Sequence, residues 1–319
     1  MDKILTNNYN RGMFDVSTKA DTLRFAIAQS IIKISPETVN LIKNQKTPKG
    51  DIIETAKISA TLGAKKTWEL IPYCHPIPID HISTEVALYK STIEIKVSVK
   101  SVWKTGVEME ALTGCSVAAL AVYDILKPID EHLSIESIKL IDKIGGKRDF
   151  IEKHRDKKIG VAIFVISDSA FNGTRVDKSG KMINDRLQNN YSHNIEIIGY
   201  EILPDNIDTI KTYLIKYSDE KKTDLIITSG GTGFSKRDVT PEATKIVIDK
   251  ETSGISEAIR SYGQRRTPLS MLSRALAGTR NKTLIINLPG STKAVSESLD
   301  LLLPGIFHAF NMLEGKGHQ

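Results

Sequence analysis

The chain has 319 residues and a formal net charge of +6, with 40% hydrophobic and 26% charged residues. This is an ordinary balance for a globular protein, and the length suits two domains. Its two cysteines, Cys74 and Cys115, exclude a disulfide framework, and no CxxC motif is present to hold zinc.

No stretch approaches the roughly 18 apolar residues that a membrane span needs, and the start MDKILTNNYNRG is too polar for a signal peptide. We therefore expect a cytoplasmic protein with no membrane partner. A nucleic-acid binder would need a Lys/Arg block or a cluster of basic and aromatic residues, and neither is present. We predict no nucleic-acid partner.

The first half of the chain predicts an α+β domain. A helix is expected over about residues 18–33, and PIDHISTEVALYKSTIEIKVSVKSVWKT predicts two strands with a turn near Tyr89–Ser91. One long helix follows over residues 106–127. The polar, glycine-led and densely charged stretch 145–158 separates the two halves, so we expect domains over 1–152 and 157–319.

The second half alternates strands and helices. The apolar run IGVAIFVIS, residues 159–167, is typical of a strand buried on both faces of a parallel sheet. A helix is predicted from about Lys178, a strand over NIEIIGYEIL, a helix from about Asn206 and a strand over TDLIITS. After a further helix, the strand KTLIINLPG leads into a helix that Ser291 caps. This order predicts an α/β domain with a doubly wound, Rossmann-like sheet.

The segment SGGTGFSKRDVTPEAT, residues 229–244, follows one of these strands. Glycines let backbone N–H groups approach an anion, and a helix start adds partial positive charge. Thr240 suits the N-cap of that helix, and Pro241 suits its first position. The segment is neither a Walker A loop nor a GxGxxG motif, so a tight strand–helix turn remains an alternative to a phosphate cradle.

Two neighbouring strand ends strengthen the phosphate interpretation. Asp205 follows the strand ending EILP, and LPGS, residues 288–291, forms a third strand end with a Gly-Ser helix start. Asp238 lies within the same segment, five residues after the last of its glycines, Gly233. Carboxylates and glycines at strand ends suit a nucleotide and its Mg²⁺.

The segments SGGTGFSKRDVTPEAT, MLSRALAG and INLPGSTKA closely resemble the molybdopterin adenylyltransferases and the G domain of gephyrin-like proteins, over about residues 157–315. The resemblance implies that molybdopterin and MgATP react to give adenylyl-molybdopterin and pyrophosphate, with Mg²⁺ held by Asp205 and Asp238 and no tightly bound cofactor. It implies that the nucleotide and pterin are bound by Gly230, Gly231, Thr232, Gly233, Glu257, Ser273, Arg274, Pro289, Gly290 and Ser291. In one departure, Ser169 stands where the family usually has an arginine.

In the first half, ELIPYCHPIPID places Cys74 beside His75. The two residues could be a nucleophile with its base, a pair of metal ligands, or packing. Adjacent side chains of an extended strand point to opposite faces, which argues against a dyad, and partners at metal-ligand spacing are missing. The same alternation leaves His75 free to face a pocket while Cys74 faces the core.

The helix predicted over 106–127 begins with Glu108 and Glu110 and ends with Asp124 and Lys127. Asp124 and Lys127 are i,i+3 neighbours, so a plain salt bridge is one interpretation. Glu110 and Asp124 fall within about 40° of each other on a helical wheel but about 21 Å apart along the axis. If both are functional, we expect a site shared between subunits.

The segments KKTWELIPYCHPIPI, KTGVEMEALTGCSVAALAVYDILK and KGDIIETAKISA are very similar to cyclic pyranopterin monophosphate synthases, over about residues 10–150. The resemblance implies a ferredoxin-like α+β subunit that converts 3′,8-cyclo-7,8-dihydroguanosine triphosphate into the cyclic monophosphate and pyrophosphate. It implies the catalytic residues Asp124, Lys49, Lys127, His75, Glu108 and Glu110. It implies the substrate-binding residues Tyr73, Cys74, His75, Met109, Glu110 and Lys147.

This resemblance also implies partners and has two departures. The partners are the small pterin and nucleotide substrates and further copies of the chain, in a hexamer built as a trimer of dimers. Tyr73 replaces the usual leucine, and the run that follows Gly145-Gly146-Lys147 is shorter than usual.

The leading hypothesis is a bifunctional enzyme for two non-consecutive steps of molybdenum cofactor biosynthesis. An alternative keeps the first half enzymatic and makes the second a non-catalytic pterin-binding or scaffolding domain. Ser169 motivates that alternative, while Asp205 and Asp238 argue against it.

Overall fold

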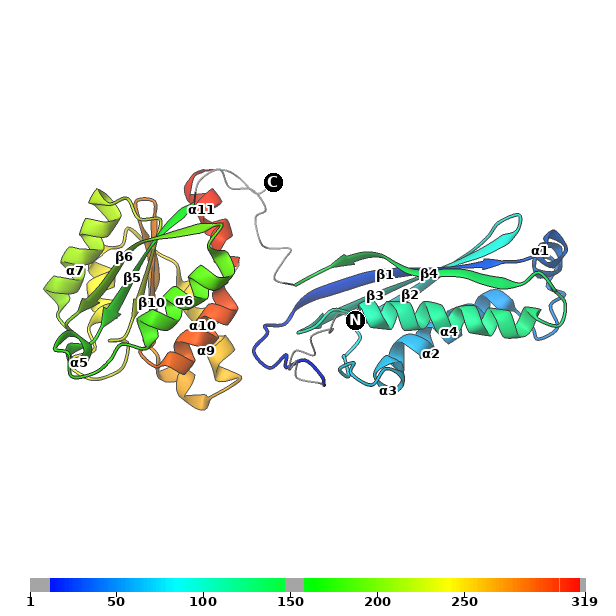
Figure 1. Cartoon of the computed structure of the whole chain (residues 1–319), viewed down its shortest axis with the longest axis horizontal. Helices are drawn as coiled ribbons and strands as arrows, with labels where there is room; N and C mark the ends of the chain where they lie inside the picture. The colour runs from blue at the N-terminus through cyan, green and yellow to red at the C-terminus, as the bar shows by residue number, and fades with distance from the viewer. Residues whose placement is uncertain (1–11, 147–157, 304, 316–319) are drawn as a thin grey trace, which may run out of the picture. The chain divides into compact units, whose positions relative to one another are not determined.

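The computed structural model describes residues 12–146, 158–303 and 305–315. The chain divides into two compact units, residues 1–149 and 150–319. Each unit has its own sheet (Figure 1), and the buried apolar residues of each unit form hydrophobic clusters of their own. The predicted two-domain architecture is therefore confirmed, and the two units are described separately below.

The first unit is an α+β domain, as predicted, and its element order is βαββαβ when the three consecutive helices after the first strand are counted together. Its elements are β1 (Thr22–Lys33), α1 (Pro36–Lys43), α2 (Ile52–Lys65), α3 (Thr67–Leu70), β2 (His81–Leu88), β3 (Thr92–Trp103), α4 (Glu108–Leu126) and β4 (Ser134–Ile144). The sheet order is β2-β3-β1-β4, and all neighbouring strands are antiparallel. Helices α2 and α4 lie side by side against the sheet (Figure 1).

The helix predicted over residues 18–33 is wrong, because Thr22–Lys33 forms the long strand β1. Burial alternates along most of the segment: Arg24, Ala26 and Ala28 are buried, and the residues between them are more exposed. This period of two is that of a strand. β1 pairs with β3 on one side and β4 on the other, so the sheet overrides the local helix propensity of the alanines.

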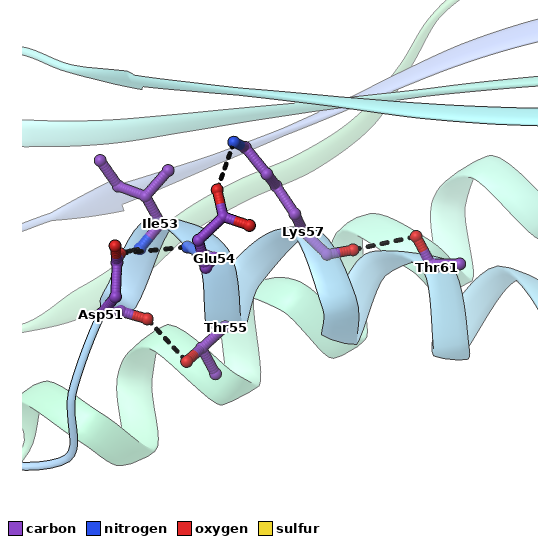
Figure 2. A network of polar contacts seen from close by, with 6 residues as sticks. All are labelled: Asp51, Ile53, Glu54, Thr55, Lys57 and Thr61. Carbon is purple, nitrogen blue, oxygen red and sulfur yellow. Dashed lines mark hydrogen bonds and ion pairs between the residues drawn. The ribbon is translucent and has the colours of Figure 1, made fainter.

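Helix α2 begins at a well-defined cap, which fixes the chain just after Lys49. The Asp51 carboxylate accepts hydrogen bonds from the backbone N–H of Ile53 (2.8 Å) and Glu54 (3.1 Å), while Thr55 Oγ1 donates to the Asp51 carbonyl (Figure 2). Such a cap satisfies backbone donors that lack intrahelical partners. It therefore holds Lys49 close to the start of α2.

Small residues let α2 and α4 approach closely. A Cβ on Gly63 would lie 2.8 Å from Val117 Cβ, and one on Gly114 would lie 3.0 Å from the Ala60 carbonyl oxygen. Of the helices in the described ranges, α4 alone is long and apolar enough to cross a membrane, but 56% of that stretch is buried inside the unit. We interpret α4 as the core helix of the first unit.

The second unit is an α/β domain, as predicted. Its strands are β5 (Ile159–Ile166), β6 (Ile195–Leu203), β7 (Leu225–Ser229), β8 (Lys250–Glu251), β9 (Ala277–Arg280) and β10 (Thr283–Leu288). Its helices are α5 (Asp168–Phe171), α6 (Ser179–Tyr191), α7 (Ile207–Ile215), α8 (Thr240–Val247), α9 (Ser253–Gln264), α10 (Thr292–Leu302) and α11 (His308–Leu313), and short helical turns cover Lys216–Glu220, Pro268–Leu272 and Gly305–Phe307.

The six-stranded sheet has the order β6-β5-β7-β10-β9-β8. The strands β6, β5, β7 and β10 are parallel, whereas β9 and β8 add an antiparallel edge that the sequence did not predict. Side chains of β5 alternate between two cores: Val161 and Ile163 join one, and Ala162 and Phe164 join the other. Helices α6 and α10 contribute to the first core and α7 and α8 to the second, so helices cover both faces of the sheet.

Candidate functional sites

The carboxyl end of α4 carries a three-residue charged cluster. Asp124 Oδ2 lies 2.6 Å from Lys49 Nζ, and Asp124 Oδ1 lies 2.7 Å from Lys127 Nζ. Lys49 reaches this position from the loop before α2, whereas Lys127 follows Asp124 by three residues on the same face of the helix. All three side chains are about half exposed, so the cluster is accessible to a substrate.

Each charge in this cluster stabilises its neighbour. Hydrogen bonds from Lys127 and then Lys49 hold the pKa of the Asp124 carboxyl at about 2, and the bond to Asp124 raises the pKa of Lys127. Asp124 is therefore fully ionised at neutral pH. A salt bridge between Asp124 and Lys127 was one prediction, and the structure extends it with Lys49 from a distant part of the chain.

A second cluster surrounds a pocket of about 240 Å³ near the start of α4. The predicted residues found in its lining are Tyr73, Cys74, His75, Glu108, Met109 and Glu110. The other lining residues are Phe14, Val16, Lys19, Ile77, Thr105 and Gly106. The residues predicted from two separate sequence segments therefore meet at one pocket.

The orientation of His75 is fixed by the segment before β1. His75 Nε2 lies 2.9 Å from the Phe14 carbonyl oxygen. A carbonyl can only accept, so Nε2 carries the proton in this hydrogen bond, and Nδ1 of the neutral ring is left as an acceptor. The arrangement suits His75 as a base within the pocket.

Cys74 is only partly buried and lines the same pocket as His75, so the prediction that Cys74 faces the core is wrong: residues 71–80 form no strand that would turn the two side chains to opposite faces. Burial, together with the charge of Glu110, raises the pKa of the Cys74 thiol, so the thiolate needed by a nucleophile is disfavoured. His75 is hydrogen-bonded to the Phe14 carbonyl oxygen. Within the described residues, no hydrogen bond joins His75 to the Cys74 sulfur. This environment argues against a Cys-His dyad.

Glu110 is the most unusual group in the pocket. Its side chain is only 3% exposed, and its Oε2 has no hydrogen-bond partner within the described part of the chain. Burial, and to a smaller extent the nearby Glu108, raises the pKa of Glu110 to about 7. Glu108 is itself paired with Lys143 at 3.0 Å. Glu110 can therefore hold or release a proton near neutral pH.

The two clusters of the first unit lie at opposite ends of α4. Glu110 and Asp124 are separated by 14 positions along that helix, or about 21 Å. The structure thus places the predicted residues in two separate clusters, and Lys147 lies outside the described residues. Lys19 also lines the pocket but was not predicted. It is a single basic residue within a segment that was predicted to be a helix, and nothing else in the sequence marks it.

The second unit has a pocket of about 370 Å³ at the carboxyl ends of its parallel strands. Residues from the ends of β5 and β7 line it, together with the loop that follows β6 and the residues that follow β10. Of the residues predicted for this site, the lining contains Asp205, Gly230, Gly231, Asp238, Gly290 and Ser291. A pocket at this edge is typical of ligand sites in parallel α/β sheets.

Glycine is required at the turn after β7. Gly230 has φ = 108°, and a Cβ there would lie 2.2 Å from the Ile166 carbonyl oxygen. Gly231 has φ = 63°, and its Cβ would lie 2.2 Å from Thr240 Oγ1. Thr240 is the first residue of α8 and not its N-cap, and its hydroxyl donates to the Gly230 carbonyl oxygen (2.9 Å). The bond fastens the glycine turn to the helix.

We expect Gly230→Ala to destabilise the second unit by about 3 kcal/mol, because the new Cβ meets a backbone oxygen that cannot move independently and φ is unfavourable for alanine. Gly254→Ala is the matched control, because nothing lies within 4 Å of its Cβ. Hydrogen exchange of Leu225–Ser229 measures the effect locally. Equal protection in the two variants would contradict the assigned backbone constraint.

The acidic residues of this pocket are held by backbone hydrogen bonds. The Asp205 N–H donates to Asp168 Oδ1 (3.0 Å), the Asp168 N–H donates to Asp205 Oδ2 (2.9 Å), and the Ser235 N–H donates to Asp238 Oδ2 (2.8 Å). Burial, followed by the charges of Asp168 and Asp238, raises the pKa of Asp205. The carboxylates are therefore close enough to repel one another.

Asp205 and Asp238 fit the needs of Mg²⁺ bound with a nucleotide. Mg²⁺ is commonly held by one or two carboxylates, with substrate phosphates and water completing its shell. No group of three or more His, Cys, Asp or Glu residues suited to a metal occurs in the described ranges 12–146, 158–303 and 305–315. Two carboxylates at an open pocket therefore suit a Mg²⁺ ion that binds together with the nucleotide. They do not suit a structural metal that is held by protein ligands alone.

Arg274 does not line the pocket, but it stabilises the segment after the glycine turn through hydrogen bonds. Its Nε donates to the Gly233 carbonyl oxygen (2.7 Å), and one terminal nitrogen donates to the Asp238 carbonyl oxygen (2.5 Å). The guanidinium also pairs with Glu242 of α8. Of the other predicted residues, those not in the lining are Thr232, Gly233, Glu257, Ser273 and Pro289. Their roles stay predictions.

Several lining residues were not predicted: Arg175, Asp177, Lys178 and Ser179 in the loop before α6 and at its start. The stretch TRVDKSG contains charged and small residues close together, which is the signal that could have identified it. Asp168, which bonds to Asp205, was also missed, although it lies only two residues after the end of β5.

Comparisons with known proteins agree with this division. Residues 13–146 match the MoaC family, and residues 162–308 match a domain described as "Probable molybdopterin binding domain". A molybdenum cofactor biosynthesis bifunctional protein from Chlorobaculum tepidum is 38% identical over 306 residues, covering 96% of each chain. A protein of the same description from Synechococcus elongatus is 33% identical over 318 residues, covering 96% of this chain and 98% of the other.

A cyclic pyranopterin monophosphate synthase from Aquifex aeolicus is 45% identical over 147 residues, covering 46% of this chain and 58% of that protein. The fold and the two sites thus define a two-domain protein of pterin cofactor biosynthesis, with a MoaC-family domain followed by a domain of the molybdopterin-binding type. The chain belongs to the molybdenum cofactor biosynthesis bifunctional proteins.

Proposed function

We propose that the first unit converts 3′,8-cyclo-7,8-dihydroguanosine triphosphate into cyclic pyranopterin monophosphate and pyrophosphate, and that the second unit adenylates molybdopterin with MgATP. The observation that carries the proposal is that separate sequence segments converge, in each unit, on accessible groups suited to phosphate-bearing substrates. Similarity over the whole length to bifunctional proteins supports this reading over a non-catalytic second domain.

In the first unit, the proposed chemistry combines charge neutralisation with proton transfer. Lys49 and Lys127 supply positive charge for a triphosphate, and the ionised Asp124 between them accepts or orients a proton. At the other half-site, Nδ1 of His75 is free to accept a proton, and Glu110 can donate one near neutral pH. Opening and reclosing a purine ring requires such donors and acceptors.

In the second unit, positioning and charge neutralisation suffice. The Gly230 N–H already donates to the Leu288 carbonyl oxygen (3.1 Å), so the proposed phosphate donor of this turn is the Gly231 N–H, and Ser291 caps the adjacent start of α10. Asp205 and Asp238 would hold Mg²⁺, which when bound neutralises phosphate charge and orients the reacting groups. The chain's own residues then align the terminal phosphate of molybdopterin with the α-phosphorus of ATP and need no covalent nucleophile.

We also propose a homo-oligomer, and specifically a hexamer, for the first unit. One α4 cannot place both of its half-sites on one small substrate, so a neighbouring copy would complete each site. Exposed apolar residues on α2 and α4, including Ile58 (67% exposed), Leu62 (56%) and Leu120 (60%), support a covered helix face. Light scattering of the full chain tests the proposal, and a monomer under assay conditions would refute the shared site.

Finer features of the fold are proposed on similar grounds. The order βαββαβ and the strand order β2-β3-β1-β4 support a ferredoxin-like first domain, over residues 1–152. The parallel strands with helices on both faces support a Rossmann-like second domain, over residues 157–319. We further propose that the partners of the chain are small pterin and nucleotide substrates and that the protein is cytoplasmic.

Substitutions in the Cys74-His75 pair should have unequal effects on pterin formation. We expect Cys74→Ser to change the rate less than about threefold, because burial disfavours the thiolate of Cys74 and serine is similar in size. We expect His75→Ala to lower the rate at least about 100-fold, because it removes the acceptor in the pocket. Steady-state assays of both variants test this, and equal losses would contradict the separation of roles.

The experiment that tests the proposed function assays the purified full-length chain on each substrate separately. We expect pyrophosphate and cyclic pyranopterin monophosphate from the cyclic nucleotide, and pyrophosphate and adenylyl-molybdopterin from molybdopterin with MgATP. Failure of the second assay alone would leave the second domain as a pterin-binding or scaffolding module. Failure of the first alone would refute the synthase assignment.

A further inference from the structure

The pocket of the second unit contains more acidic than basic residues. Its lining contains three carboxylates, Asp177, Asp205 and Asp238, and two cations, Arg175 and Lys178. A nucleotide or a pterin phosphate adds further negative charge when it binds. Positively charged side chains that remain available to a phosphate are therefore decisive for affinity.

Within the described residues, Asp177 forms no ion pair with Arg175 or Lys178, and its carboxylate accepts hydrogen bonds from neutral donors. Oδ1 accepts hydrogen bonds from the Ser179 hydroxyl (3.2 Å) and the Gly180 N–H (3.0 Å), and Oδ2 accepts one from the Tyr200 hydroxyl. These bonds fix the start of α6.

The backbone of Arg175 is anchored while its side chain is exposed. The Arg175 N–H donates to the Ser169 carbonyl oxygen (3.0 Å), which also accepts from the Thr174 N–H (2.9 Å) and the Thr174 hydroxyl (2.9 Å). Among the residues of the described ranges, none forms a recorded hydrogen bond or ion pair with the Arg175 guanidinium. The loop therefore presents a fixed backbone and an available cation at the pocket.

The anchor of this loop is the residue at which the resemblance predicts an arginine. The Ser169 hydroxyl lies 3.1 Å from the Ser167 hydroxyl and carries no charge into the pocket. Resting on the function proposed above, we propose that Arg175 binds a substrate phosphate in this pocket and supplies the positive charge that Ser169 lacks. A planar guanidinium can donate two parallel hydrogen bonds to a phosphate, which suits it to this role.

The test uses the full chain and the Arg175→Gln variant, with Lys181→Gln as a control. Lys181 is exposed at the start of α6 but does not line the pocket. MgATP is varied at saturating molybdopterin in one arm, and molybdopterin at saturating MgATP in the other. We expect Arg175→Gln to raise the KM in one arm about tenfold or more while kcat changes little, as for the loss of a charged hydrogen bond made in both ground and transition states.

The arm whose KM rises identifies whether the phosphate belongs to the nucleotide or to the pterin. Unchanged KM values in both arms, or an equal increase for Lys181→Gln, would overturn the proposal. The double variant Ser169→Arg, Arg175→Gln should recover most of the lost affinity, because it returns the charge to the adjacent position. No recovery would overturn the claim that Arg175 replaces a charge missing at Ser169.

A binding measurement separates this proposal from the proposed function. If the wild-type chain forms no adenylated product, its affinity for inorganic pyrophosphate is measured by calorimetry instead. Binding that Arg175→Gln weakens about tenfold supports the phosphate site even without adenylation. Unchanged binding in the variant, or no binding by the wild type, overturns the proposed site.

Discussion

Replacing Asp124 with asparagine should lower pterin formation at least about 100-fold and leave adenylation unchanged. Asp124 is ionised between Lys49 and Lys127, and asparagine has similar size but neither the charge nor a usable proton affinity. The second unit has its own core and its own pocket, so its activity should not depend on this side chain. Both activities of the same preparation, assayed separately, give the comparison.

The fold of the first unit should survive this substitution. The two ion pairs of Asp124 are about half exposed, and exposed pairs contribute little to the free energy of unfolding. Both tryptophans, Trp68 and Trp103, lie in the first unit, so their fluorescence reports its unfolding selectively. Glu131→Gln is the control for losing a negative charge at an exposed position outside both clusters. Loss of both activities from Asp124→Asn would instead indicate misfolding or coupling between the units.

The first unit should lose stability as the pH rises, and Glu110 should be the cause. The Glu110 pKa is raised from 4.5 in the unfolded chain to about 7 in the folded chain. Below pH 4.5 Glu110 is protonated in both the folded and the unfolded chain, so its titration does not change the free energy of unfolding. Between these values the folded state keeps the proton that the unfolded state releases, so the free energy of unfolding falls with increasing pH.

The size of this loss follows from the two pKa values. A difference from 4.5 to about 7 corresponds to a loss on the order of 3 kcal/mol above pH 7. Glu110→Gln removes the titration, so the variant should be more stable than the wild type at pH 8 by a similar amount, and the difference should vanish near pH 4.5. Urea unfolding followed by tryptophan fluorescence at several pH values measures it.

Glu131→Gln should leave the pH dependence of unfolding unchanged, because Glu131 is exposed. A Glu110→Gln curve parallel to that of the wild type would contradict the buried, proton-holding role of Glu110. Although more stable, the Glu110→Gln variant should form less cyclic pyranopterin monophosphate, because it has lost the proposed proton donor. Gain of stability with loss of activity is common where a functional group is buried without a partner.

The second unit could be predicted from its sequence more completely than the first. Each parallel strand is a short apolar run followed by a turn, and helix starts such as Asn206 and Ser291 carry recognisable caps. The strand ends therefore identified Asp205, Asp238 and the glycine turn. The loop containing Arg175 was missed because its place at the pocket depends on backbone bonds to Ser169, which no sequence periodicity reveals.

Long-range pairing limited prediction for the first unit. The segment Thr22–Lys33 contains alanines that favour a helix, and only its pairing with β3 and β4 makes it the central strand. The meeting of Lys49 with Asp124 likewise joins positions far apart in the sequence, and the family resemblance, not spacing, indicated it. The buried state of Glu110 depends on packing around the start of α4, which a single sequence does not show.

The placement of both half-sites on the single helix α4 has a genetic consequence. If each site takes one half from each of two copies, a chain lacking His75 and a chain lacking Asp124 can complement one another. A mixed pair would contain one site with both defects and one site with neither. Co-expression of the two inactive variants should therefore restore a fraction of pterin formation, whereas either variant alone should restore none. Two different damaging alleles of this gene would then be milder together than either is when present alone.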